Sequence, residues 1–106
     1  RYLRERGFAV VHDVALGLTG HAFAAVPPER WVEVARDNAR PEADGYFLSC
    51  TNTTQIEAIA GIEQSLGKPV VNSNQAVLWG CMKRLGHALS PGGPDPRLGV
   101  LMTLET

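Results

Sequence analysis

One stretch of the chain, Asp44-Gly45-Tyr46-Phe47-Leu48-Ser49-Cys50-Thr51-Asn52, changes abruptly from apolar to small polar residues after Leu48. This change is typical of a buried strand followed by its end. Apolar residues spaced three to four positions apart then predict a helix from Thr54 to Leu66, and Gly67 predicts its stop. Val70 and Val71 begin a second strand, which again breaks into polar residues at 72–74. The stretch and its neighbours therefore predict the order strand, helix, strand.

Further elements flank this unit. Thr54 and Glu57 stand at the spacing of a capping box, in which two side chains satisfy N–H groups at the start of a helix. Another helix is predicted from about Gln75 to Gly86, and prolines at 27–28 predict the start of an earlier helix that runs to about Ala39. The remaining expectations are the last turn of a helix at 1–6, a strand at 8–14, a loop at 17–26, a linker or exposed loop at 90–97 and an additional strand at 98–106.

The strands are apolar without alternation, and helices separate them along the chain. Parallel strands that are covered on both faces by crossover helices have this pattern. We therefore expect an α/β fold, a three-layer sandwich with a mainly parallel sheet of Rossmann-like or flavodoxin-like type, over residues 1–89. Because the sequence begins inside a helical turn without an initiator Met, we also expect a longer polypeptide.

The composition argues against several classes of partner. The 106 residues carry 10 Lys and Arg against 11 Asp and Glu, so no basic excess is present to bind nucleic acid. The apolar runs are far shorter than the roughly 20 residues that span a bilayer, so no membrane segment is expected. Two cysteines are too few for a disulfide scaffold, which predicts reduced thiols in a cytoplasmic protein. The three histidines lack a metal-ligand spacing, so no metal site is expected.

Cys50 is the leading candidate for chemistry. It follows a strand and precedes a helix N-terminus, where free N–H groups and the helix dipole favour an anion, either a thiolate or a bound carboxylate. A cysteine in such a place can act as a nucleophile or carry a proton. Thr51 and Asn52 add hydrogen-bond donors beside it. The alternative is a cysteine that packs as a small hydrophobic residue.

Ser73 and Asn74 stand at the end of the second strand and are candidate binding residues. Ligands of open parallel sheets bind beyond the carboxyl ends of the strands, so donors at 72–74 could hold an anionic group beside Cys50. Helix capping is the other role expected of such residues, and it is compatible with binding. Cys81 is expected to pack in the core, and Trp31 and Trp79 are expected in the core or at a subunit interface.

Two motifs, Ser49–Asn52 and Leu66–Ala76, resemble the aspartate/glutamate/hydantoin racemase superfamily. The likeness is greatest to the branch that holds maleate cis-trans isomerases, arylmalonate decarboxylase and ectoine-utilisation proteins, and it extends from about Gly7 to Gly86. It implies a two-domain, pseudo-symmetric protein in which two similar α/β halves enclose the active site, without a metal or an organic cofactor. This chain resembles the second half.

By this resemblance, the Cys50 thiol moves a proton at a carbon next to a carboxylate, and Thr51 helps to hold that carboxylate. Racemases often have histidine where Asn52 stands, and the decarboxylase has glycine where Thr51 stands, so this chain departs from both patterns. The implied function is a cofactor-independent isomerase for a small carboxylate or dicarboxylate. The alternatives are an arylmalonate-type decarboxylase and a non-catalytic domain that binds a small anion. The expected partners are a small carboxylate substrate and the missing first half of the cleft. A homo-oligomer is a further alternative that the sequence leaves open.

Overall fold

A computed structural model of the chain describes residues 2–18, 22–86 and 95–104. In chain order its elements are α1 (Tyr2–Glu5), α2 (Ala22–Ala25), α3 (Pro28–Asp37), β1 (Tyr46–Leu48), α4 (Gln55–Leu66), β2 (Val70–Asn72) and α5 (Ser73–Leu85), followed by the 3₁₀ helices η1 (Pro96–Leu98) and η2 (Val100–Thr103). Among the described residues, the sheet has two strands.

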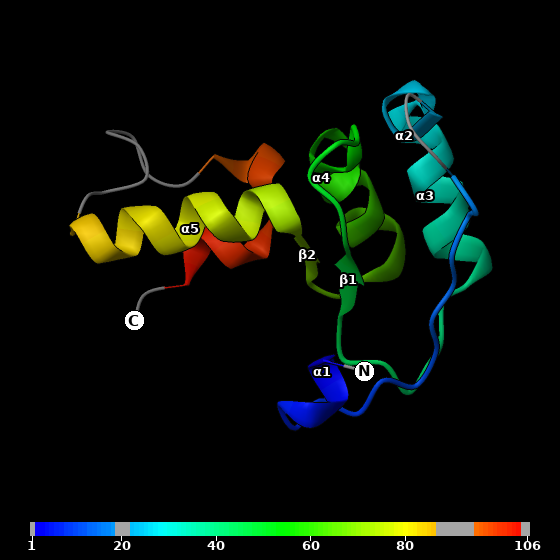
Figure 1. Ribbon diagram of the computed structural model, residues 1–106, viewed down its shortest axis with the longest axis horizontal. Coiled ribbons are helices and arrows are strands. Elements are labelled where there is room, and N and C mark those ends of the chain that lie inside the picture. Colours follow the sequence, from blue (N-terminus) through cyan, green and yellow to red (C-terminus); the bar gives the residue numbers. More distant parts are fainter. Residues whose placement is uncertain (1, 19–21, 87–94, 105–106) are drawn as a thin grey trace.

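The centre of the fold is the unit β1–α4–β2. The two strands run parallel, with Tyr46 opposite Val70 and Leu48 opposite Asn72, and α4 makes the crossover between them (Figure 1). The predicted α/β class, the strand–helix–strand order and the parallel pairing are confirmed. Because the strands are parallel and in register, their carboxyl ends lie side by side.

Helix α4 supplies most of the buried core. Ile59 and Ile62 are fully buried, and they pack with Val70 of β2 and Trp31 of α3. Helix α3 lies against α4 on the side away from α5, as Figure 1 shows. The predicted helix over 27–39 is confirmed at 28–37, with Pro28 in its first turn, where the missing N–H costs nothing.

The ends of α4 and α5 are set by glycines and by one polar cap. Gly67 and Gly86 adopt φ values of 67° and 70°, the left-handed conformation that ends a helix, as the sequence predicts. The predicted capping box at Thr54 is wrong, because its hydroxyl instead donates to the carbonyl of Val26 at 2.8 Å. A capping box does form at the start of α5, between Asn72 and Gln75.

The predicted strand at 8–14 is wrong. These residues are extended but pair with no strand in the described part of the chain, and Phe8, Val11 and Val14 remain 63%, 49% and 53% exposed. A strand needs a neighbour to satisfy its N–H and C=O groups, and β1 has its partner only in β2 among the described residues. The apolar composition of residues 8–14 is therefore not enough to make them a strand.

The strand expected at 98–104 is also wrong, and side chains explain why. This segment forms η1 and η2, separated by Gly99 at φ 84°. The Glu63 carboxylate accepts the Val100 N–H at 3.1 Å, and the Gln75 amide donates to the Leu98 carbonyl. These side chains satisfy backbone groups that a neighbouring strand would otherwise bind. Residues 90–94 of the expected linker lie outside the described part.

Three smaller expectations also differ. Residues 22–25, expected in a loop, form α2. Cys81 is exposed rather than packed in the core, because α5 extends away from the central unit, with η1 and η2 beside it (Figure 1). Trp31 is buried as expected, whereas Trp79 is half-buried and donates its indole N–H to the Leu104 carbonyl at 3.4 Å. No helix within the described ranges is long and apolar enough to cross a bilayer.

Replacing Gly99 by alanine should destabilise the fold by about 2–4 kcal/mol in urea unfolding. A Cβ there would lie 2.6 Å from Cγ2 of the buried Ile59 and 3.0 Å from the Glu63 carboxylate, on a backbone at φ 84°. Gly86→Ala is the matched control, since Gly86 has φ 70° but no atom within 4 Å of the added Cβ. It should cost only about 1 kcal/mol. Equal losses would contradict the close packing of Gly99, at the junction of η1 and η2, against α4.

Candidate functional site

The two predicted site segments meet at the carboxyl ends of β1 and β2. The backbone N–H of Cys50 donates to the Ser73 hydroxyl oxygen at 3.0 Å. The side-chain amide of Asn74 donates to the Thr51 carbonyl, also at 3.0 Å. These bonds join residues 23 positions apart, so the loop after β1 is tied to the first turn of α5.

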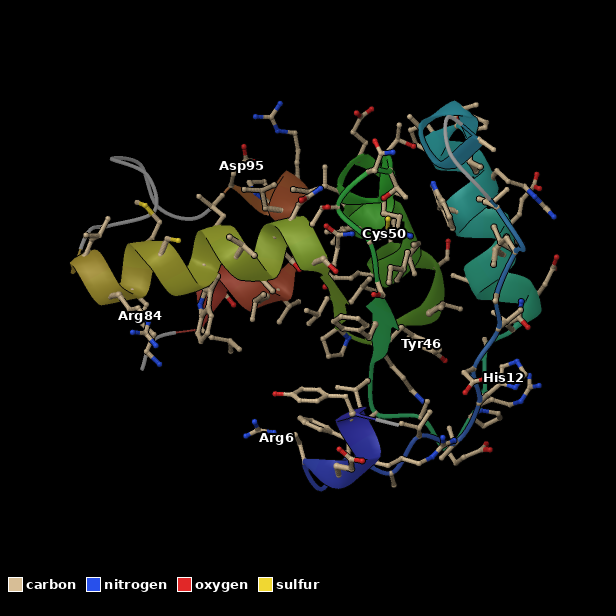
Figure 2. The ribbon with its side chains drawn as sticks, in the orientation of Figure 1. Arg6, His12, Tyr46, Cys50, Arg84 and Asp95 are labelled. Carbon is tan, nitrogen blue, oxygen red and sulfur yellow. The ribbon has the colours of Figure 1, made fainter. Side chains whose placement is uncertain are left out.

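Cys50 occupies an unusual backbone conformation. Its φ is 125°, the one positive value at a non-glycine residue among those described. Residues with a Cβ disfavour this region by about 1–3 kcal/mol, and such strain persists where the surroundings impose it. Here the N–H bond to Ser73 is one such constraint, and the Asn52 N–H donates to the Cys50 sulfur at 3.4 Å. The thiol of the half-buried Cys50 is thus held beside a backbone donor; Figure 2 shows Cys50 in the loop that follows β1.

Asn72 lies beneath this loop and organises both strand ends. It is fully buried, and its amide nitrogen donates to the Leu48 carbonyl at 3.2 Å and to the Gln55 side chain at 2.7 Å. Its side-chain oxygen accepts the backbone N–H groups of Asn74 and Gln75. The capping role considered for Asn72 is confirmed, and both its side-chain nitrogen and its side-chain oxygen bind protein groups.

A cavity of about 430 Å³ opens beside Cys50. Three parts of the chain line it: His12 and residues 14–18; Trp31, Val34, Ala35 and Asn38 of α3 and its end; and Tyr46, Leu48, Ser49, Cys50, Thr53 and Gln55 of β1 and the following loop. Most of these side chains are apolar. The thiol therefore lies at the border between an apolar cavity and a polar loop.

The other predicted site residues differ in how far they are exposed to solvent. Thr51 and Asn52 are exposed, and Ser73 and Asn74 are half-buried. The Ser73 hydroxyl accepts from Cys50, which leaves its own proton for donation to another group. The structure brings Cys50, Thr51, Ser73 and Asn74 together at one edge, whereas their contacts with a ligand stay a prediction.

Sequence reasoning missed the opposite wall of the cavity. Trp31 and Val34 were visible only as part of an apolar helix face, and residues 14–18 had no regular pattern. The role of Gln75 had a signal, because Asn72 and Gln75 stand three positions apart at a helix start. Within the described ranges, no group of three or more His, Cys, Asp or Glu side chains is arranged to hold a metal ion.

Fold and site define a small α/β domain with a cysteine at the carboxyl edge of a parallel sheet. The family model of arylmalonate decarboxylase matches residues 1–95, so the chain belongs to the arylmalonate decarboxylase family, a branch of the aspartate/glutamate racemase superfamily. The resemblance found in the sequence is thereby confirmed.

Individual relatives agree with this assignment. Arylmalonate decarboxylase from Bordetella bronchiseptica is 34% identical over 101 residues, which are 92% of this chain and 40% of that protein. A solved structure of a glycine-to-cysteine mutant of arylmalonate decarboxylase, in a sulfate-associated form, matches with a TM-score of 0.80 and 31% identity over 95% of this chain and 43% of the other. A second arylmalonate decarboxylase structure gives a TM-score of 0.77, 32% identity and coverage of 95% and 44%. The chain thus spans less than half the length of these relatives.

The strain at Cys50 has a measurable consequence. Cys50→Gly should be more stable than Cys50→Ala by about 1 kcal/mol, because glycine relieves a strain of roughly 1–3 kcal/mol and loses part of that gain to chain entropy. Urea unfolding of both variants measures the difference. The same pair at Ser49, whose φ is not positive, should show the reverse order. A Cys50→Gly variant less stable than Cys50→Ala would contradict the strained conformation.

The Asn72 side chain should matter far more than that of Asn74. Asn72→Ala removes a helix cap and leaves the buried Gln55 oxygen without its donor, so we expect a loss of about 2–4 kcal/mol in urea unfolding. Asn74→Ala removes one bond at the surface, to the Thr51 carbonyl, and should cost less than about 1 kcal/mol. Similar losses from both changes would be inconsistent with a buried organising role for Asn72.

Proposed function

We propose that the protein containing this chain decarboxylates a substituted malonate without a cofactor, with Cys50 as the proton donor. The observation that carries the proposal is the position of the Cys50 thiol, which lines a mostly apolar cavity at an edge where two strand ends present hydrogen-bond donors. Membership in the arylmalonate decarboxylase family supports this reaction over the isomerisation expected first.

The two sides of the site suit the two parts of such a substrate. A carboxylate that remains in the product needs donors, which the Ser73 hydroxyl and the loop at 51–52 can supply. An aryl or alkyl substituent needs an apolar surface, which Trp31, Val34 and Leu48 provide. The second carboxylate, placed beside such side chains, loses hydration, and its loss as neutral CO₂ moves the negative charge away from the apolar surface onto the α-carbon and the retained carboxylate.

The proposed reaction balances without a further reactant. The C–C bond to one carboxylate breaks, CO₂ leaves, and the electron pair remains on the α-carbon and the retained carboxylate as an enediolate. Donors placed at that developing charge lower the barrier. The Cys50 thiol then gives its proton to the α-carbon, and the resulting thiolate regains a proton from water.

The proposed active site needs a second wall, which this chain does not supply. Because the relatives are more than twice as long as this chain, we propose that a second α/β half faces Cys50 and adds donors for the enediolate. The three-layer, pseudo-symmetric arrangement belongs to that complete protein.

Cys50→Ala in the intact protein should lower decarboxylation of phenylmalonate by about 10²–10⁴-fold, the range that a positioned general acid contributes. The rate of CO₂ release measures the loss. Cys81→Ala is the matched control, since Cys81 is exposed on α5 about two helical turns beyond Ser73, and the activity of this variant should not change. Full activity of Cys50→Ala would overturn the assigned role.

Thiol labelling separates the enzyme from a domain that only binds an anion. Iodoacetamide should modify Cys50 and Cys81, and phenylmalonate should protect Cys50 alone, as read by mass spectrometry. Protection of Cys50 together with CO₂ release from phenylmalonate supports the decarboxylase. Protection without turnover of phenylmalonate or maleate would instead support the binding domain, and maleate isomerisation without CO₂ release would support the isomerase.

A further inference from the structure

The extended segment 8–18, here called the strap, forms one wall of the cavity although it belongs to no sheet. Figure 1 shows it running from α1 along α3 toward α2. Its residues 14–18 line the cavity, yet most of the strap is exposed to solvent. An extended segment without strand pairing needs other contacts to keep its place.

His12 joins the strap to the end of α3 through side-chain hydrogen bonds. The His12 Nε2 atom lies 3.0 Å from the Asn38 side-chain oxygen, and the Arg40 guanidinium lies 3.3 Å from His12 Nδ1. A neutral imidazole with its proton on Nε2 donates to Asn38 and accepts from Arg40. Two further attachments lie on either side, the Arg4 bond to the Val10 carbonyl at 3.3 Å and the packing of Leu18 on the core.

The partners of His12 are themselves fixed to the scaffold. Asn38 ends α3, and its side-chain nitrogen donates to the Val34 carbonyl at 2.9 Å. The Arg40 backbone is held by the Tyr46 hydroxyl, which donates to the Arg40 carbonyl and accepts the Arg40 N–H, both at 3.3 Å. His12 therefore connects the strap to the end of α3 and, through Arg40 and Tyr46, to the start of β1.

This connection lies at the end of the cavity away from the thiol. Tyr46 and Cys50 both line the cavity and are four residues apart along the chain, which corresponds to roughly 13 Å of extended backbone. Figure 2 shows Cys50 beyond the upper end of β1 and His12 much lower in the view, near the end of α3. Releasing His12 would free the wall at 14–18 without touching the residues around Cys50.

We propose that His12 is a positioning residue that holds the strap as the outer wall of the cavity and so limits the size of the group that reaches Cys50. The consequence for substrate choice rests on the proposed function, in which the cavity takes the aryl or alkyl substituent of the malonate. The role of His12 in holding the strap does not depend on whether the protein decarboxylates a malonate.

The test compares alkylation of Cys50 by iodoacetamide and by the bulkier fluorescein-5-maleimide in the intact protein. His12→Phe keeps a ring but removes both hydrogen bonds, and it should raise the ratio of bulky to small labelling at Cys50 by roughly three- to tenfold. His12→Gln retains one donor and one acceptor and should stay within about twofold of the wild type. Labelling of Cys81, on the exposed side of α5, is the internal reference.

Arg40→Met gives a second route if His12→Phe does not fold, because it removes the donor to His12 Nδ1 and keeps an apolar stem. It should raise the same ratio by a smaller factor. An unchanged ratio in both variants would overturn the proposal, as would an equal rise in His12→Gln, which would indicate general loosening. A raised ratio in a protein that does not decarboxylate phenylmalonate would leave His12 in its role and reject the proposed function.

Discussion

The buried side chain of Asn72 holds the end of β1, the start of α4 and the start of α5 in one arrangement. It binds the Leu48 carbonyl, the Gln55 side chain and two N–H groups of α5. A buried amide is costly to leave unsatisfied, so each of these partners is constrained by the others. The loop that carries Cys50 is built on this arrangement, and its strained φ of 125° depends on the neighbours remaining in place.

The fold separates two chemical environments within a short distance. Donors come from the loop at 50–52 and the first turn of α5, while the apolar surface comes from α3, β1 and the strap. A thiol at this border can give a proton to a carbon that is shielded from water on one side and stabilised by hydrogen bonds on the other. The proposed cofactor-free proton transfer would use both environments.

Much of the central unit could be predicted from the sequence, because local signals decide it. The change from apolar to polar residues after Leu48 and after Val71 marks both strand ends, and Gly67 and Gly86 mark both helix ends. Parallel pairing then brings Cys50 and Ser73 together. The segments at 8–14 and 98–104 were predicted wrongly because their apolar runs resemble strands, whereas strand formation depends on a partner elsewhere in the chain. The cavity wall at Trp31 and the bond between His12 and Asn38 depend on contacts between residues far apart in the sequence. Such contacts leave no local pattern from which they could be predicted.

The most direct test of the central claim is the fate of phenylmalonate incubated with the intact protein in D₂O. We expect CO₂ release and phenylacetate with a single deuterium on the α-carbon, seen by NMR, because the exchanged Cys50 thiol delivers one deuteron to the carbon that loses CO₂. Recovery of unreacted phenylmalonate, at protein concentrations where phenylmalonate protects Cys50 from iodoacetamide, would contradict the account: the site would then bind the dicarboxylate without decarboxylating it.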